Sequence, residues 1–264
     1  MSGTASNGRT YRERNTTADR ALDILTMFDE TELVVSATAV AGRLGVARST
    51  AYRYLQSLVS SRFLEEAPGG GFRLGLRVME IARLARHSYG LPELALPAMV
   101  SLSERTAETV LLTRRVGDLV VCVETAEPGR RPVRISYERG SALPINAGAS
   151  AHVLLAWSSP DETRGMLQAA TLRRFTPSTL VDVDELMERL KGIRQAGYAI
   201  SRAELDPDIV GIAAPIQDDT GQVVAAVSVA ALASRVTREA EADIVGHVLT
   251  AAREIADRMA AVAG

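Results

Sequence analysis

Three segments in the first sixty residues have apolar positions that recur at helical spacing. The first follows Thr16 and predicts an amphipathic helix. Its apolar face is predicted to consist of Ala21, Leu22, Leu25 and Phe28. A second helix is expected between Ser36, whose hydroxyl suits an N-cap, and Gly45, which suits a left-handed C-terminal position. Only a very short turn then separates the second helix from the third segment.

The third segment, Ala47 to Ser60, predicts a helix with two different faces. The inner face consists of Ala51, Leu55, Leu58 and Val59, and the outer face carries Ser49, Arg53, Gln56 and Ser57. The outer face therefore presents hydrogen-bond donors rather than carboxylates. Two short β-prone runs, 63–65 and 72–74, flank a Pro-Gly-Gly-Gly turn and predict a hairpin. Together these elements predict a winged helix-turn-helix over residues 15–76.

The helical pattern continues beyond Leu76 in a segment that is too apolar for a free spacer, and it ends at a Tyr-Gly-Leu-Pro sequence. We expect a linker helix over residues 77–90. In residues 91–264, helical and strand patterns alternate, and Gly117-Asp118 marks a hairpin. Strands are expected at 110–115, 119–124, 133–137, 198–202, 209–217 and 223–230, and helices at 92–105, 149–157, 160–169, 182–197 and 238–262. The pattern predicts an α/β (α+β) fold with a mixed or antiparallel sheet flanked by helices.

The composition is that of an ordinary soluble protein. The chain has 264 residues, of which 47% are hydrophobic and 23% charged, enough to bury a full core. The longest apolar runs are far shorter than the roughly 20 residues of a membrane-spanning helix. The polar N-terminus lacks the apolar region of a secretory signal. We therefore expect a disordered leader at residues 1–14, no membrane partner and a cytoplasmic location.

Charge and cysteine content narrow the possible functions. Residues 1–90 carry a net charge of +3 and the remainder −5, an asymmetry expected when only one segment contacts phosphate. The single cysteine, Cys122, excludes an internal disulfide and a multi-cysteine zinc site. A metal site formed by this cysteine, an acid and a histidine stays open on sequence grounds. We expect neither a metal nor a cofactor.

Several motifs resemble those of the IclR family of bacterial regulators. In the first part of the chain they are RALDIL at 20–25, ARSTAYR at 47–53 and GFRLG at 71–75. In the second part, residues 143–144, 154–156, 197–199, 211–215 and 225–229 resemble the family's effector domain, in the same order. The resemblance covers roughly residues 15–260. It implies a GAF-like effector domain, a long linker helix, and a homodimer that often pairs into a dimer of dimers.

The resemblance also implies a transcriptional repressor or activator that binds double-stranded operator DNA and responds to a small organic acid. It would control a catabolic operon. The helix at 47–60 would enter the major groove, which admits one helix. There Arg53 is expected to read guanine and Gln56 adenine. Phosphate contacts that fix the register are expected from Ser49, Thr50 and Tyr52. Arg48 and the wing residue Arg73 are expected to add backbone or minor-groove contacts.

For the effector, the resemblance carries eight pocket residues onto this sequence: Leu143, Ala149, Ser150, Ser201, Ile209, Gly211, Ser228 and Ala230. Helical N–H groups and serine hydroxyls would hold a carboxylate without an arginine. Ala151-His152 replaces the Gly-Lys of many family members, and Ser201 occupies an acidic position. The loss of negative charge favours a bulkier or more acidic effector such as an aromatic acid. We expect His152 to be structural or to lie at the rim.

Two other classes of function fit parts of the pattern. An enzyme needs a nucleophile or an acid–base pair, and the chain has three histidines and no Gly-x-Ser-x-Gly elbow. Glu204 and Asp206 are a candidate pair, but Pro207 indicates a loop in which carboxylates are solvated. We therefore expect no enzyme. An adaptor would use the winged helix to bind protein, and would lack the salt-dependent DNA affinity of a regulator.

Overall fold

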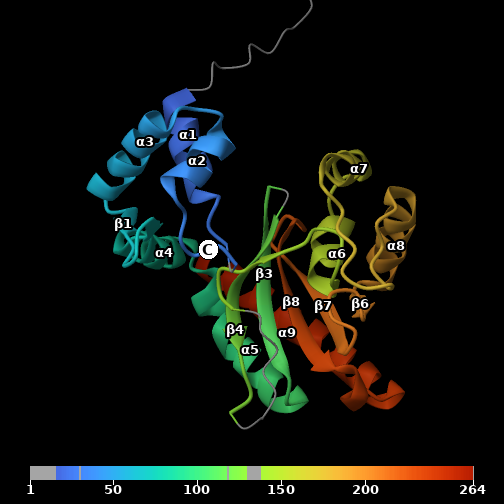
Figure 1. The fold of residues 1–264 in the computed structure, drawn as a ribbon. Helices are drawn as coiled ribbons and strands as arrows, with labels where there is room; N and C mark the ends of the chain where they lie inside the picture. The colour runs from blue at the N-terminus through green and yellow to red at the C-terminus, as the bar shows by residue number, and fades with distance from the viewer. Residues whose placement is uncertain (1–15, 30, 118, 130–137, 264) are drawn as a thin grey trace, which may run out of the picture. The chain divides into compact units, whose positions relative to one another are not determined.

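The computed structural model describes residues 16–29, 31–117, 119–129 and 138–263. The leader expected at 1–14 and the strand expected at 133–137 lie outside the described residues. Two compact units meet in the sequence between Tyr89 and Gly90. Figure 1 shows the helices and strands of both units.

The N-terminal unit is a winged helix-turn-helix, as predicted. It contains α1 (Thr16–Leu25), α2 (Ala37–Leu44), α3 (Arg48–Ser60), β1 (Leu64–Glu66) and β2 (Phe72–Leu74). The two strands pair antiparallel, with Leu64 opposite Leu74. The core of the unit contains Ile24, Val35, Val40, Ala51, Leu55 and Phe72.

Local signals account for the boundaries of α2 and the start of α3. The Ser36 hydroxyl accepts a hydrogen bond from the N–H of Ala39 at 3.1 Å, and Gly45 ends the helix with φ of 63°. Glycine adopts this left-handed conformation without the Cβ clash that other residues meet. Ala47 is extended and precedes α3. The turn between α2 and α3 is therefore short, as the sequence predicts.

The predicted apolar face of α1 was partly wrong. Leu22 is 61% exposed, whereas Ile24 is fully buried. Residues two positions apart on a helix point about 200° apart, so these two side chains cannot both face the core. Since α1 packs against α2 and α3 on one side only, the fold selects Ile24 and leaves Leu22 in solvent.

The helix α4 (Leu76–Tyr89) occupies the segment in which the linker helix was expected. It exposes large apolar side chains, among them Leu76, Met79 and Ile81, which are 70%, 68% and 39% exposed. A soluble helix normally confines such residues to one buried face. This helix therefore has more apolar surface than the N-terminal unit covers.

The C-terminal unit is built on a six-stranded sheet in the order β5-β4-β3-β8-β7-β6, and every pairing is antiparallel. The antiparallel arrangement is thus the correct one of the two that the sequence allowed. The strands are β3 (Thr109–Val116), β4 (Leu119–Ala126), β5 (Ala142–Leu143), β6 (Ala199–Arg202), β7 (Ile209–Gln217) and β8 (Val223–Leu232). The short β5 was not predicted.

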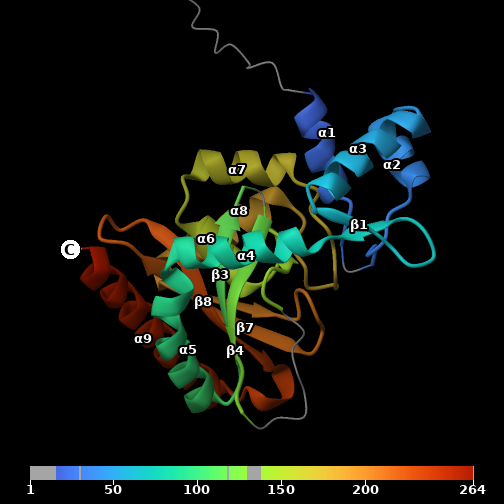
Figure 2. The same ribbon diagram turned by 90° about the vertical axis from the view of Figure 1, so that its left-hand side faces the viewer.

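Helices cover both faces of this sheet, as Figures 1 and 2 show. One face packs against α5 (Leu91–Thr106) and α9 (Arg238–Ala263). The other packs against α6 (Ala149–Ala156), beside which lie α7 (Pro160–Ala169) and α8 (Val183–Ala196). A short 3-10 turn, Ala233–Arg235, follows β8. Because both of its faces are covered, the central strand β8 is apolar almost throughout.

Side chains cap the N-termini of α7 and α8. The Ser159 hydroxyl accepts from the N–H of Glu162 at 3.2 Å, and the Asp182 carboxylate accepts from the N–H groups of Asp184 and Glu185.

Every side chain of α6 is buried, so this helix has no solvent face. None of the helices in the described part of the chain is long and apolar enough to cross a membrane.

Candidate functional site

The outer face of α3 carries six of the seven residues predicted to contact DNA. Arg48, Ser49, Tyr52 and Arg53 are exposed, and Thr50 and Gln56 are partly exposed. The seventh residue, Arg73, is exposed on β2. Residues 51 and 55 of α3, on the opposite face, are fully buried. The helix thus has the two faces that its sequence predicts.

Neighbouring acids on the wing engage two of the seven side chains. Arg73 Nε pairs with Glu65 Oε1 at 2.7 Å, and Gln56 Nε2 donates weakly to Glu66 Oε1 at 3.4 Å. Such exposed pairs contribute about 0–1 kcal/mol, so a phosphate or a base can replace the carboxylate at little cost. By contrast, the Arg53 guanidinium has no partner among the residues that the structure describes.

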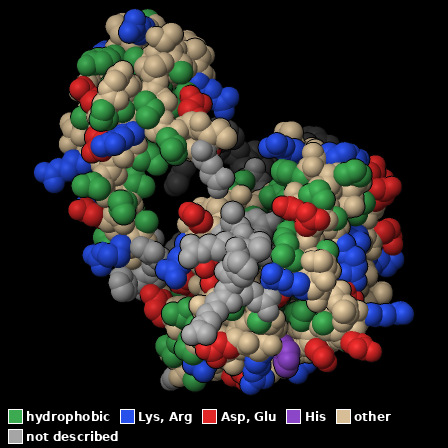
Figure 3. Space-filling view, turned by 60° about the horizontal axis from the view of Figure 1, so that its bottom comes forward, with side chains coloured by type: hydrophobic (Ala, Val, Ile, Leu, Met, Phe, Trp, Pro, Cys, Tyr) green, Lys and Arg blue, Asp and Glu red, His purple; other side chains and the backbone are tan. Residues whose placement is uncertain are grey.

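A surface groove of about 490 Å³ follows α3. Its lining includes Thr17, Thr50, Arg53, Gln56, Ser57 and Ser60. Arg20 of α1 donates to the Tyr54 hydroxyl at 3.2 Å and so links α1 to α3 beside the groove. The groove therefore presents hydroxyl, amide and guanidinium groups on a helix that its neighbours hold in place. On the face of the C-terminal unit that Figure 3 shows, basic and acidic side chains are interspersed rather than gathered by sign.

The C-terminal unit contains a small cavity at the first turn of α6, with a volume of about 40 Å³. Six of the eight predicted effector residues line it: Leu143, Ala149, Ser150, Ser201, Ile209 and Ser228. The other two, Gly211 and Ala230, pair with each other across β7 and β8 and do not line it. A Cβ atom on Gly211 would lie 3.4 Å from the Cβ of Ala149, so this glycine lets α6 approach the sheet.

The fold brings these residues together from distant parts of the chain. Ser228 of the central strand β8 lies opposite Leu111 of β3 and Ala213 of β7. Along β8, Ser228 shares the α6 face of the sheet with residues 226 and 230, since side chains alternate between faces. Ser201, at the end of β6, pairs with Gly211. Because α6 packs across β6, β7 and β8, its first turn closes the cavity.

Hydrogen-bond donors converge on the cavity. The Ser150 hydroxyl donates to Ser228 Oγ at 2.9 Å, and both residues are buried. The Ser228 hydroxyl then has no acceptor, and the Ser201 hydroxyl no partner, among the described residues. The first intrahelical bond of α6 runs from the N–H of His152 to Gly148 O. The N–H groups of residues 149–151 therefore stay without helical acceptors.

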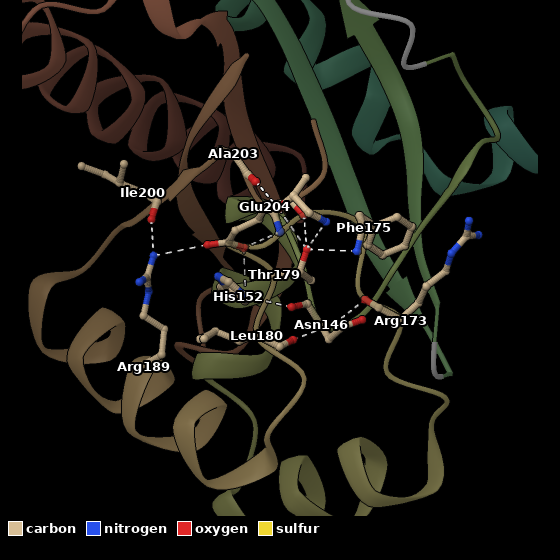
Figure 4. Close-up of polar contacts among 12 residues, drawn as sticks. Asn146, His152, Arg173, Phe175, Thr179, Leu180, Arg189, Ile200, Ala203 and Glu204 are labelled. Carbon is tan, nitrogen blue, oxygen red and sulfur yellow. Dashed lines mark hydrogen bonds and ion pairs between the residues drawn. The ribbon is translucent and has the colours of Figure 1, made fainter. Parts of the chain in front are cut away.

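A carboxylate that the sequence placed in solvent also lines the cavity. Glu204 is only 4% exposed and accepts a hydrogen bond at Oε2 from the N–H of Gly148 at 2.9 Å. In Figure 4 it lies between Arg189 of α8, whose Nη2 is 3.4 Å from Oε1, and His152, whose Nε2 is 3.6 Å from Oε2. The prediction of a solvated acid was wrong for Glu204, whereas Asp206 is exposed.

The loop after β6 turns inward for reasons that its own sequence does not reveal. Ala203 adopts a left-handed φ of 55°, which is uncommon for a residue other than glycine. The Thr179 hydroxyl donates to Glu204 O at 2.6 Å, and the Thr176 hydroxyl donates to Ala203 O. Both threonines precede α8 in the sequence. The inward orientation of Glu204 thus depends on contacts with a segment about 25 residues away.

His152 lies in the interior and not at the rim of the cavity. It is fully buried, and Nδ1 has no partner among the described residues. Burial lowers the pKa of its imidazole, although the Glu204 carboxylate acts in the opposite direction. Asn146, just before α6, donates to Arg173 O and Leu180 O at 3.1 and 2.8 Å, and its own carbonyl lies 3.4 Å from His152 Nε2. These contacts fix the start of α6.

Cys122 has no reactive environment in this structure. It is buried, and burial raises the pKa of its thiol to about 11. A thiol with such a pKa is a poor nucleophile and a poor metal ligand at neutral pH. In the described ranges, no three His, Cys, Asp or Glu side chains are grouped so that they could hold a metal ion.

Comparisons with known protein families cover almost the whole chain. Residues 84–257 match the family described as bacterial transcriptional regulator IclR C-terminal, and residues 17–68 match the IclR helix-turn-helix domain. The regulator XynR of Escherichia coli is 31% identical over 83% of this chain and 86% of its own length. The repressor AllR of Salmonella typhimurium is 32% identical over 84% of this chain and 81% of its own length.

Two solved structures support the same relationship. An IclR transcriptional regulator from Silicibacter superposes with a TM-score of 0.83, at 27% identity over 92% of this chain and 95% of that one. An IclR homolog from Microbacterium hydrocarbonoxydans, solved in complex with 4-hydroxybenzoate, has a TM-score of 0.76 at 27% identity. That comparison covers 92% of this chain and 98% of the homolog.

Proposed function

Because this chain belongs to the IclR family of bacterial transcriptional regulators, which are not enzymes, we propose that a small organic acid modulates its affinity for operator DNA. The single observation that carries the proposal is the pairing of two sites in one chain. A helix with an exposed face of donors lies in the N-terminal unit, and a buried polar cavity lies in the C-terminal unit.

For DNA recognition, we propose that α3 enters the major groove. Arg53, whose guanidinium has no partner within the described ranges, would pair with the edge of a guanine, and Gln56 with adenine. The remaining predicted residues would contact the DNA backbone and set the register: Arg48, Ser49, Thr50, Tyr52 and Arg73. Arg73 would then exchange its Glu65 partner for a phosphate.

For the effector, we propose the cavity at the start of α6. The free N–H groups of residues 149–151 and the hydroxyls of Ser201 and Ser228 form a site for a carboxylate. The homolog solved with 4-hydroxybenzoate supports an organic acid as the class of ligand. If the acid comes from a catabolic pathway, the regulator would control the operon for the breakdown of that acid.

For assembly, we propose a homodimer, and pairing of two dimers, with α4 as a contact. The exposed side chains of Leu76, Met79 and Ile81 would be covered by a second copy of the chain. A dimer reads two half-sites whose centres are about 34 Å apart, or a multiple of that distance. An acid that binds one dimer geometry more tightly than another would shift the spacing of the two α3 helices.

The experiment is a titration of the protein against the region upstream of its own gene, with competitor DNA, at two salt concentrations. We expect specific binding that weakens as salt rises, because phosphate contacts release counterions. Addition of the acid should change the affinity. An absence of DNA binding at both salt concentrations would contradict the proposal and favour an adaptor whose winged helix binds protein.

A further inference from the structure

The cavity at the start of α6 contains a negative charge that the resemblance did not predict. The family's acidic position is occupied by Ser201, and a cavity without an acid was expected. Glu204 instead supplies a carboxylate from the loop after β6, and this carboxylate lines the cavity. The expectation that lost negative charge favours a bulkier or more acidic effector is therefore not supported by the structure.

The polar groups of the cavity include a carboxylate, which only accepts, N–H groups, which only donate, and serine hydroxyls, which can do both. Glu204 is the carboxylate, and although Gly148, Arg189 and His152 contact its two oxygens, these oxygens offer about four acceptor sites and can take a further hydrogen bond. The donors are the Ser201 and Ser228 hydroxyls and the N–H groups of residues 149–151. Ser201 is only 5% exposed, yet its hydroxyl has no partner in the described part of the chain. This hydroxyl is open to the cavity, where a ligand or a water molecule can be its partner.

The acceptor and the donors lie next to each other. Glu204 Oε2 is 2.9 Å from the nitrogen of Gly148, and the free N–H groups begin at the very next residue. A ligand that satisfies both must carry an anionic acceptor and, close to it, a hydrogen-bond donor. A carboxylate with a hydroxyl on the adjacent carbon has this arrangement.

We propose that the effector is a small 2-hydroxy carboxylic acid whose carboxylate binds the start of α6 and whose hydroxyl donates to Glu204. This inference rests on the proposed function, because it names the ligand of that same cavity. Glu204 then selects the ligand, whereas Ser201 and Ser228 hold its carboxylate. The partly buried Leu205 and Ile209 form the part of the wall that must move to admit even a small acid.

Related acids fit the cavity less well. A simple carboxylic acid offers no donor to Glu204, and a 2-oxo acid places a second acceptor against the carboxylate. A 2-amino acid brings an ammonium group with three donors, whereas the charge of Glu204 is already balanced by Arg189. The hydroxy acid matches one donor to one acceptor.

The test is calorimetric titration of the full-length protein with acids of the same carbon skeleton: the two lactate enantiomers, propanoate, pyruvate and L-alanine. We expect one lactate enantiomer to bind about tenfold more tightly than propanoate, pyruvate or L-alanine, the effect of one buried hydrogen bond. Glu204→Gln should reduce this preference to within about threefold, because an amide satisfies a hydroxyl and a carbonyl alike. Asp206→Asn, in the same loop but exposed, is the matched control and should leave the preference unchanged.

Several outcomes would overturn the inference: equal binding of lactate and propanoate, tighter binding of pyruvate or alanine, or no binding of any of these acids. An unchanged preference in a folded Glu204→Gln protein would do the same. If that variant does not fold, the preference of the wild-type protein remains decisive. Ser201→Ala should weaken the binding of all of these acids to the same extent. The DNA titration without acid is independent, so a regulator that binds DNA but ignores these acids would refute only this inference.

Discussion

The two candidate sites differ in how the chain builds them. The DNA-contacting residues lie on one helix and one adjoining strand, within 26 positions of sequence, and most of them are exposed. The cavity residues come from β3, β5, α6, β8 and the segment around β6 and β7, and most of them are buried. A change on α3 should therefore alter binding without altering stability. A change in the cavity should alter both, because close-packed interiors do not adjust freely.

The largest expected effect is that of Ser228→Leu. The new side chain would fill the cavity of about 40 Å³ and remove the bond from Ser150, so no acid should bind. Overpacking a core typically costs about 1–3 kcal/mol of stability. DNA affinity in the absence of acid should be unchanged. The measurements are DNA titrations with and without acid, and thermal unfolding. Ser178→Leu, at an exposed site, is the control and should still respond to the acid. If the Ser228→Leu protein also responds to the acid, the ligand binds elsewhere.

Arg53→Ala tests the other side of the comparison. The loss of a bidentate base contact should weaken specific DNA binding by about 1–3 kcal/mol, or roughly fivefold to 150-fold. The free energy of unfolding should change by less than about 0.5 kcal/mol, because Arg53 is exposed. Fluorescence anisotropy with operator DNA and chemical denaturation measure the two quantities. The control is Arg62→Ala, which removes the same charge from a residue beyond the other end of α3. Wild-type operator affinity in the Arg53 variant would refute our assignment of the reading residue.

The burial of His152 should make the stability of the C-terminal unit depend on pH. Because burial lowers the pKa of His152 from 6.5, the unfolded chain takes up a proton that the folded protein does not. The contribution of neutral His152 to stability is complete above about pH 6.5 and is lost as the pH falls toward the pKa of His152 in the folded protein. The free energy of unfolding should change by at most about 1.4 kcal/mol per pH unit as a result.

Chemical denaturation of the wild type and of His152→Gln, at several pH values on either side of about 6.5, measures this contribution. We expect the variant to lose stability less steeply as the pH falls. His247→Gln, on the partly exposed surface of α9, is the control and should retain the wild-type slope. Identical slopes for all three proteins would show that His152 is protonated equally in both states.

The smallest expected effects come from the two serine caps, one in each unit. Ser36→Ala and Ser159→Ala each remove one hydrogen bond to a helix N-terminus and should each cost about 1 kcal/mol. Hydrogen exchange resolved along the chain should show the loss of protection in the N-terminal unit for the first variant and in the C-terminal unit for the second. Loss of protection in both units from either change would show that they unfold together.

Most of the secondary structure could be predicted from local patterns, and the errors have identifiable causes. The periodicity of α1 allowed either Leu22 or Ile24 to face inward, and only packing against α2 and α3 decided between them. The two-residue strand β5 was missed because its pairing with β4 is not encoded locally. For the site, motif resemblance identified six of the residues that line the cavity but not Glu204.

The sequence alone determined the two-faced helix α3, because apolar periodicity and the glycine and serine signals around α2 act within a few residues of each other. The meeting of Ser150, Ser201 and Ser228 at one cavity was predicted by resemblance to the family and not by a local pattern. Only the tertiary structure decided the environment of Glu204. A left-handed Ala203 and the hydroxyl of Thr179 turn this carboxylate inward, toward Gly148 and Arg189. Burial of a charge depends on partners from distant segments, and a local pattern carries no information about them.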